Sequence, residues 1–225
     1  MKYENIKPAV FLSRPNRFIA HIEVDGKEEI CHVKNTGRCR ELLTDRAEIY
    51  VQHFNSPERK TKYDLIAVRK NANLINMDSQ APNKVFHEWV KDGNFLDEIT
   101  YIKPECKYKN SRFDFYIETK ELKIFAEIKG VTLEENGVVM FPDAPTERGV
   151  KHINELIECK KEGFEAYIFF IIQMKDCKYF TPNRKTHPEF ADALEKARSN
   201  GVNIVALNCN VSPNELKICD KVKII

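Results

Sequence analysis

The chain has 225 residues, of which 42% are hydrophobic and 31% are charged, and its formal net charge at pH 7 is +2. This composition is that of an ordinary soluble globular protein, and it excludes the disordered and fibrous classes. A net charge so close to zero does not by itself indicate a nucleic-acid partner.

Cysteine usage and hydropathy indicate the cellular location. The seven cysteines form an odd set without a CxxC pair, which argues against both a disulfide framework and a thiolate zinc site. The first residues lack the apolar core of a signal peptide, and the longest apolar run, "AYIFFII" at 166–172, is too short to cross a bilayer. We therefore expect a cytoplasmic protein with no membrane partner.

The first third of the chain has the pattern of a small β-barrel. From Ala9 to Met77, short β-prone runs alternate with polar turns, and they predict five or six strands. Asp25 and Gly26 form a hairpin signal between two of these runs. We therefore expect a barrel domain at residues 1–80.

The rest of the chain, residues 81–225, has the pattern of an α/β domain. "PNKVFHEWVKDG" has helical periodicity, with Val85 and Trp89 on one face. In "FEAYIFFIIQM", apolar and polar residues do not alternate, which predicts a central strand covered on both faces. Thr186 and Glu189 form a capping box that predicts a later helix. Further elements are expected as strands around 99–108, 112–118, 122–128 and 137–141 and in "NIVALNC" and "ELKIC", and as a helix from about 145 to 161.

Charged residues interrupt two of these apolar strands. Asp114 lies inside one strand, and Glu127 and Lys129 lie at the end of the next. If the two strands form a hairpin that turns at 120–121, the numbers of paired residues sum to 241, so Asp114 lies opposite Glu127. Strand alternation then places a set of apolar side chains together on the other face: Phe113, Phe115 and Ile117.

Two opposed carboxylates about 5 Å apart repel each other, and ionised side chains in half-buried strands are costly unless they are paired or bind a metal. With the carbonyl of Ile128, Asp114 and Glu127 would suit a hard cation such as Mg²⁺ or Mn²⁺. Lys129 would then orient or deprotonate an attacking water, or neutralise charge on a phosphate. The alternative is that Glu127 and Lys129 only end a strand with solvated charges.

An Asp followed at a modest interval by Glu-x-Lys at a strand end resembles the PD-(D/E)XK nuclease superfamily. Phe113 stands where the motif has Pro, which is a common departure. The resemblance implies that Asp114, Glu127 and Lys129 are catalytic, and that the two acids bind the metal. Glu88, on the preceding helix, looks like the additional metal-binding acid that many members contribute.

Longer motifs follow one another along the chain. They are "SRPNRFIA" at 13–20, "NTGRCRELL" at 35–43, "RKTKYDL" at 59–65, "SRFDF" at 111–115, "EIKGVTLEENGVVMFPDAPTERGVKHINEL" at 127–156 and "GVNIVALNCNVSPNELKI" at 201–218. Together they resemble the sugar fermentation stimulation protein A family over nearly the whole chain. The resemblance implies an N-terminal OB-like β-barrel followed by a PD-(D/E)XK restriction-endonuclease-like α/β domain, α+β overall, in a protein associated with DNA binding. The family name attaches it to the regulation of sugar metabolism genes.

A candidate phosphate clamp lies in "FPDAPTERGVKHI". Arg148 and His152 are four residues apart, so they share one face of the predicted helix near its N-terminus. The alternative is that Asp143 or Thr146 only caps the helix and that His152 is a surface residue.

Basic residues of the barrel form a candidate nucleic-acid surface. Barrels of this class bind nucleic acid through a cationic groove with aromatic stacking platforms, and Phe18 and Tyr63 could supply the rings. Scattered basic residues are also the usual solvated surface. Gln173, at the end of the central strand, could contact a metal water or a phosphate, or only satisfy a backbone group. The basic candidates are Arg14, Arg17, Arg38, Lys60 and Lys62, together with Arg112 near the acidic pair.

These features predict a DNA-binding protein with metal-dependent phosphodiester hydrolysis. A catalytically silent DNA-binding transcriptional regulator of sugar metabolism is one alternative. A hydrolase that acts on RNA or on a small phosphate compound is another. In each of the first two cases the expected partner is nucleic acid, with DNA preferred.

Overall fold

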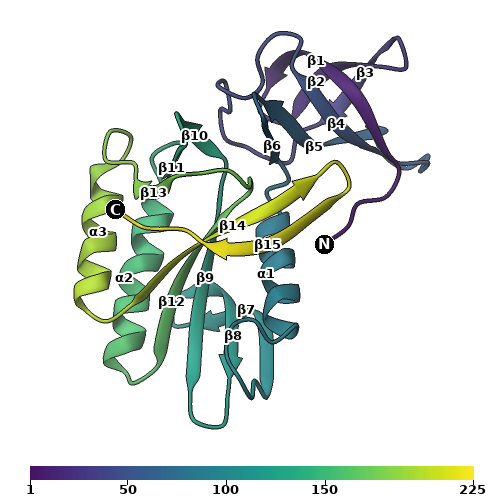
Figure 1. The fold of residues 1–225 in the computed structure, drawn as a ribbon. Coiled ribbons are helices and arrows are strands. Elements are labelled where there is room, and N and C mark those ends of the chain that lie inside the picture. The colour runs from purple at the N-terminus through teal and green to yellow at the C-terminus, as the bar shows by residue number, and fades with distance from the viewer.

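Two bodies of secondary structure, a barrel and a larger α/β domain, form the computed structural model of residues 1–225 (Figure 1). The barrel strands are β1 (Ile6–Asn16), β2 (Ile19–Val24), β3 (Lys27–His32), β4 (Glu48–His53), β5 (Tyr63–Lys70) and β6 (Asn73–Asn76). Their order is β3-β2-β1-β4-β5-β6, and β3 also pairs with β5, so β1, β2, β3, β5 and β4 close a ring. The predicted barrel is therefore confirmed, with the five-stranded closure that is typical of OB folds.

The β2–β3 hairpin shows how closely local residue types determine the barrel. Val24 pairs with Lys27 across a two-residue turn. Asp25 and Gly26 both have positive φ, +52° and +74°. A turn with two left-handed residues matches the right-handed twist of the flanking strands, which is why Asp-Gly is favoured there.

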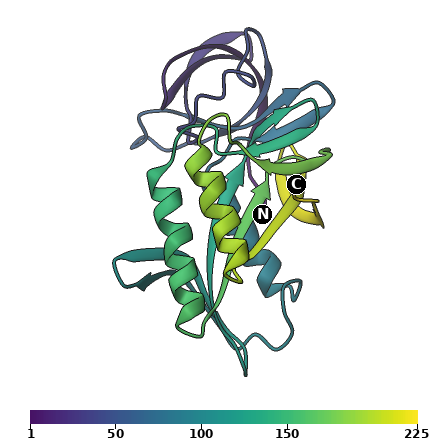
Figure 2. The ribbon, with the colours of Figure 1, turned by 90° about the vertical axis from the view of Figure 1, so that its left-hand side faces the viewer.

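The second body is a mixed sheet with helices on both faces. The sheet has the order β15-β14-β12-β9-β8-β7, with β12 parallel to both neighbours. Figure 2 shows α2 and α3 side by side in front of the sheet, and Figure 1 shows α1 on its other side. The bounds are α1 (Ala81–Lys91), β7 (Tyr101–Tyr108), β8 (Ser111–Glu118), β9 (Lys123–Val131), α2 (Glu147–Lys161), β12 (Glu165–Ile172), α3 (Pro188–Ser199), β14 (Asn203–Ser212) and β15 (Glu215–Lys221).

A small second sheet was only partly predicted. It has the order β10-β11-β13, with β10 (Leu133–Glu135), β11 (Val138–Phe141) and β13 (Tyr179–Pro182). Only β11 was expected, since its four residues are all apolar, whereas β10 and β13 mix apolar and polar residues over too short a length to show periodicity. The predicted capping box is wrong: His187 is the N-cap of α3 without a side-chain bond, and the Thr186 N–H donates to Asn183 Oδ1 at 3.2 Å.

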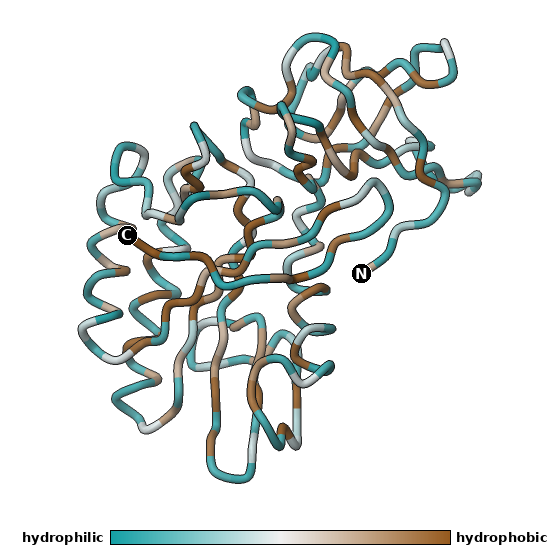
Figure 3. Tube along the Cα trace, in the orientation of Figure 1, coloured by the Kyte–Doolittle hydropathy of each residue, from teal (hydrophilic) through white to brown (hydrophobic).

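Apolar packing on both faces of the sheet explains why apolar and polar residues do not alternate along β12. On the α1 face, Phe169 packs against Phe86 with ring centroids 4.6 Å apart. On the other face, Phe170 stacks on Phe180 at 4.2 Å. Hydrophobic residues accordingly concentrate along the central strands (Figure 3), and the prediction of a strand covered on both faces is confirmed. None of the three helices has the length and apolar character needed to span a membrane.

A buried polar network joins the barrel to the centre of the sheet. Lys34 bridges Asp64 and Asp78 at 3.3 and 3.1 Å, and these two aspartates are only 2% and 0% exposed. The amide of Gln173, which follows β12, donates to the backbone carbonyls of Asn76 and Asp78, at 3.1 Å each. Each buried charge is therefore compensated, and the same bonds attach the barrel to the strand ends beside the acidic pair.

A second link across the domains is an ion pair. Lys70 on β5 lies 2.7 Å from the carboxylate of Glu134 on β10. Burial alone would raise the pKa of Glu134, but hydrogen bonds from Lys70 and from the Gly137 N–H lower it more, so the pKa lies below its usual value.

We predict that Glu134→Gln lowers the free energy of unfolding by about 1 kcal/mol at pH 7. Because the folded-state pKa is depressed, the ionised carboxylate stabilises the protein above the unfolded pKa of about 4.3, and this contribution is lost as pH falls through the folded value. Urea denaturation should therefore show that the free energies of unfolding of the wild type and of Glu134→Gln become equal as the pH is lowered. Glu135→Gln, at the exposed neighbouring position, is the control. An equal loss of stability in both variants at every pH would show that the ion pair between Lys70 and Glu134 does not stabilise the fold.

Candidate active site

The backbone is irregular at Asp114. The β8–β9 hairpin has the predicted register, but its ladder ends with Phe115 paired to Ala126. The β7–β8 ladder has no pair between Glu105 and Asp114, and Glu105 has a φ of +53°. The Asp114 carboxylate instead accepts the backbone N–H of Ile128 at 2.8 Å. The strands therefore separate where the acidic residues stand, as bulged strands often do beside functional sites.

This irregularity corrects one sequence prediction. Phe115 packs on Phe86 of α1, with centroids 5.1 Å apart, whereas Phe113 packs on Phe125, on the α2 face, at 5.4 Å. Phe113 and Phe115 were expected on one face together with Ile117. That expectation is wrong for Phe113 because strict alternation fails across Asp114.

Glu127 is a buried carboxylate with one free oxygen. The residue is 3% exposed. Its Oε1 lies 2.6 Å from Lys129 Nζ and 2.5 Å from His152 Nδ1, while its Oε2 is buried without any hydrogen-bond partner. Burial alone would raise the pKa of Glu127, but the His152 hydrogen bond and the Lys129 charge outweigh it, and the pKa is lowered. The side chain is therefore held ionised with one oxygen unused.

Asp114 is held from the opposite side of the sheet. Asn83, in the first turns of α1, donates to its Oδ1 at 2.9 Å. Burial and, second, the negative charge of Glu127 raise the pKa of Asp114, and the bonds from Ile128 and Asn83 only partly oppose them. The two carboxylates are thus electrostatic neighbours across the end of the ladder, one supported by α1 and the other by α2.

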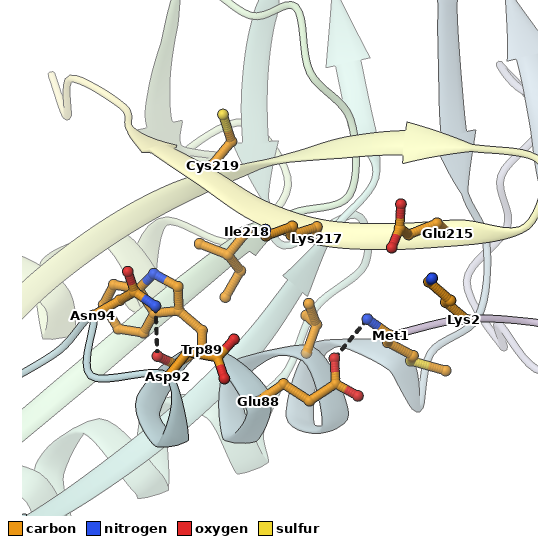
Figure 4. Close-up of a pocket in the computed structure, with 11 residues that line it drawn as sticks. Met1, Lys2, Glu88, Trp89, Asp92, Asn94, Glu215, Lys217, Ile218 and Cys219 are labelled. Carbon is orange, nitrogen blue, oxygen red and sulfur yellow. Dashed lines mark hydrogen bonds and ion pairs between the residues drawn. The ribbon is translucent and has the colours of Figure 1, made fainter.

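Glu88 does not join this pair. Its carboxylate lies 2.5 Å from the amino group of Met1 and is 54% exposed. It lines a separate cavity of about 670 Å³ beside Trp89, between α1 and β15 (Figure 4). No group of three or more His, Cys, Asp and Glu side chains is placed to hold a metal ion. The expectation that Glu88 completes the metal site is therefore wrong.

The candidate phosphate clamp is partly assembled. Arg112, Arg148 and His152 line one cavity of about 630 Å³. His152 is only 4% exposed, however, and its Nε2 faces the Arg148 Nε at 3.4 Å. Because its Nδ1 contacts Glu127, His152 positions the acid rather than presenting a free edge to phosphate. Thr146 is the N-cap of α2 and accepts from the Gly149 N–H at 3.0 Å.

The Arg14 side chain forms its hydrogen bonds within the barrel. Its guanidinium donates to four backbone carbonyls, at 2.7 to 3.0 Å, and so fastens a loop. These bonds use the donors that a phosphate would need, so Arg14 is not a free phosphate ligand. The carbonyls belong to Arg17, Asn35, Gly37 and Arg38.

The other barrel candidates are solvent-facing. Arg17 lies over the ring of Phe18 at 4.9 Å, and Phe18 is 46% exposed. Tyr63 is 6% exposed and belongs to the core, so the expectation that it offers a stacking platform is wrong. The basic side chains that remain exposed are Arg17, Arg38, Lys60 and Lys62.

Two further residues support the site from outside the acidic pair. Gln173 donates from its amide nitrogen to backbone carbonyls, which is the second of the two roles considered for it. Asn83 was not foreseen, because it lies 31 residues from Asp114 and no periodicity marks a helix amide that reaches a strand.

Two family models match the chain. One, described as "Sugar fermentation stimulation protein RE domain", covers residues 80–215, and another, described as "SfsA N-terminal OB domain", covers residues 12–77. The second match agrees with the small barrel predicted from the strand pattern and with the OB class that the family resemblance implies. Together they extend over most of the chain.

Relatives match over the full length. The sugar fermentation stimulation protein homolog of Clostridium beijerinckii is 60% identical over 225 residues, with 100% of both chains covered. That of Ruminiclostridium cellulolyticum is 59% identical over 224 residues, covering 100% of this chain and 99% of the relative. A solved structure, Pyrococcus furiosus SfsA in complex with Ca²⁺, is 29% identical with a TM-score of 0.90, covering 100% of this chain and 98% of the other.

We predict that His152→Ala lowers the free energy of unfolding by about 2 kcal/mol or more, because it removes a hydrogen bond to a buried charge. Urea denaturation at pH 7 measures the change. Asn154→Ala, on the exposed side of the same helix, should stay within about 0.5 kcal/mol. The loss should also be smaller in a Glu127→Gln background, and a loss of unchanged size there would show that His152 does not act on Glu127.

Proposed function

This chain belongs to the sugar fermentation stimulation protein family, and we propose that it is a DNA-binding protein with a metal-dependent phosphodiesterase site at Asp114, Glu127 and Lys129. The unpartnered Oε2 of the buried Glu127 carries the proposal. A buried polar atom without a partner is rare and costly, and a ligand commonly supplies the missing partner.

The donor set fits a hard divalent cation. Carboxylate oxygens of Asp114 and Glu127 would hold the ion, and both acids are already fixed by hydrogen bonds to Asn83, Ile128 and His152. Burial and, second, repulsion from Glu127 raise the pKa of Asp114, and a bound cation would relieve that repulsion. The Ca²⁺ complex of the Pyrococcus furiosus relative supports an oxygen-preferring cation of this kind, of which Mg²⁺ and Mn²⁺ are the candidates.

When bound, such a cation would supply electrostatic stabilisation of the charge that develops on a phosphoryl oxygen. The protein's own residues would do the rest. Lys129 is 16% exposed at its side chain and lies against Glu127, so its ammonium can orient a water for attack or donate to a phosphate oxygen. His152 and Asn83 would keep the two acids in place while the substrate binds.

The position of the site agrees with the PD-(D/E)XK resemblance. The acids lie at the point where adjacent antiparallel strands separate, in a sheet with helices on both faces. The barrel adds a domain class that commonly binds nucleic acid. Both features favour a polynucleotide substrate over a small phosphate compound.

Two observations favour a second candidate, a catalytically silent DNA-binding regulator. Lys129 and His152 already compensate Glu127 without a metal, and no third acid joins the pair. Such a protein would bind DNA and leave it intact in every metal.

We predict that Mn²⁺ raises the melting temperature of the wild-type protein, because a ligand that binds only the folded state adds about 2.7 kcal/mol of stability at 100 times its dissociation constant. Differential scanning calorimetry with and without Mn²⁺ measures the shift. Asp114→Asn and Glu127→Gln should each abolish it, whereas Glu121→Gln, in the exposed β8–β9 turn, should retain it. The same shift in all four proteins would place the ion elsewhere.

We also predict DNA cleavage with Mg²⁺ or Mn²⁺, followed on plasmid, single-stranded DNA and RNA. Asp114→Asn and Lys129→Met should each reduce the rate by about 100-fold or more, because each removes a group that stabilises charge at the reacting phosphate. Glu121→Gln should cleave at the wild-type rate. Cleavage that survives in the site variants would exclude this site, and DNA binding without cleavage in any metal would favour the silent regulator. Faster cleavage of RNA than of DNA would change the substrate class.

A further inference from the structure

The cavity that contains Arg112, Arg148 and His152 is walled by the β7–β8 turn on one side and by α2 on the other. None of its lining residues is hydrophobic. Five of them carry a positive charge: Lys107, Lys109, Arg112, Arg148 and Lys151. Only Arg112 and Arg148 were expected from the sequence, since the lysines come from two segments that the fold brings together.

The five cationic side chains of the cavity form few and mostly long ion pairs within the protein. Arg112 has Glu105 at 3.4 Å, Lys151 has Glu155 at 3.8 Å, and Lys109 pairs with Glu162. Lys107 and Arg148 have no ion pair within 4.0 Å. The three paired cationic side chains are about half exposed, and ion pairs made by exposed side chains contribute at most about 1 kcal/mol each. An incoming polyanion can therefore displace the carboxylates at low cost.

The two walls are fastened to each other and to the candidate site. Lys151 Nζ donates to the backbone carbonyl of Asn110 at 3.3 Å, which ties α2 to the β7–β8 turn. His152 forms part of the lining and contacts Glu127 on its other side. A phosphate chain in the cavity would thus lie one side chain away from the acidic pair.

Resting on the proposed function, we infer that this cavity binds the phosphodiester backbone of duplex DNA and leads it to Glu127. Lysine and arginine contacts to phosphate give affinity without sequence preference. Proteins that bind single strands add aromatic platforms on which bases stack, and the lining of this cavity has no aromatic ring apart from the imidazole of His152. The lining therefore fits a backbone whose bases are paired and turned inward.

The test is a titration of the full chain in EDTA, which prevents hydrolysis. Fluorescence anisotropy of a labelled blunt-ended DNA duplex is followed from about 50 to 200 mM KCl. The groove variant carries Lys107→Glu, Arg112→Glu and Lys151→Glu. The matched control carries Lys217→Glu, Lys221→Glu and Lys223→Glu, which change the charge equally at exposed positions at or just beyond β15, the opposite edge of the sheet.

The groove variant should lose at least tenfold in duplex affinity. Its slope of log K against log salt should become shallower by about 2 to 3, since each phosphate contact contributes about 0.9. The control should stay within about threefold of the wild type. If circular dichroism shows that the groove variant is unfolded, Lys107→Gln, Arg112→Gln and Lys151→Gln replace it, with about half the charge change and a proportionally smaller loss of affinity.

Equal losses in groove and control variants would overturn the inference, because net charge alone would then explain the binding. Unchanged duplex affinity, or a loss confined to single-stranded DNA or to RNA, would also overturn it. Because the titration contains no metal, a groove effect without cleavage in any metal would refute hydrolysis and leave duplex binding by this cavity intact.

Discussion

The buried carboxylate of Glu127 is the constraint around which the α/β domain is arranged. A charge at 3% exposure must be compensated, or its burial costs several kcal/mol. Compensation comes from Lys129 on the same strand and from His152 on α2. The position of α2 is therefore fixed by an electrostatic requirement as well as by packing. Gly149 allows the close packing of α2 against α3, since a Cβ there would lie 2.9 Å from the Thr146 side chain and 3.1 Å from Phe190 on α3.

The same strand end also fixes the barrel. A Cβ on Gly130, the residue after Lys129, would lie 2.6 Å from the Gln173 Oε1 and 2.7 Å from the Pro82 ring of α1. Gln173 in turn holds the segment that leaves the barrel, through the carbonyls of Asn76 and Asp78. The barrel, α1 and the two central strands thus meet within one residue of the candidate site. Because Gln173 contacts both the barrel segment and Gly130, these contacts couple the position of the barrel to the backbone next to Lys129.

Much of this fold could be predicted from local patterns, and the site only in part. Alternation and turn residues predicted five or six barrel strands, of which the structure has six, and they gave the hairpin register as far as Phe115 and Ala126. They failed at Asp114, because alternation assumes an unbroken ladder. They failed again where a side chain's role depends on distant partners. Arg14 could not be distinguished from a phosphate ligand, nor Glu88 from a metal ligand, until their partners were located.

The net charge could not predict the cationic cavity, for a reason that the fold makes clear. A total of +2 averages over the whole surface, while binding responds to the local field. Many acids are used elsewhere, as with Asp192 and Glu195 on α3, which pair with Arg184 in the turn before that helix. The cations of the cavity come from segments about 40 residues apart, and no window along the sequence contains them together. The topology of the sheet, rather than composition, concentrates positive charge beside the buried acid, and the proposal of a polyanionic partner rests on this placement.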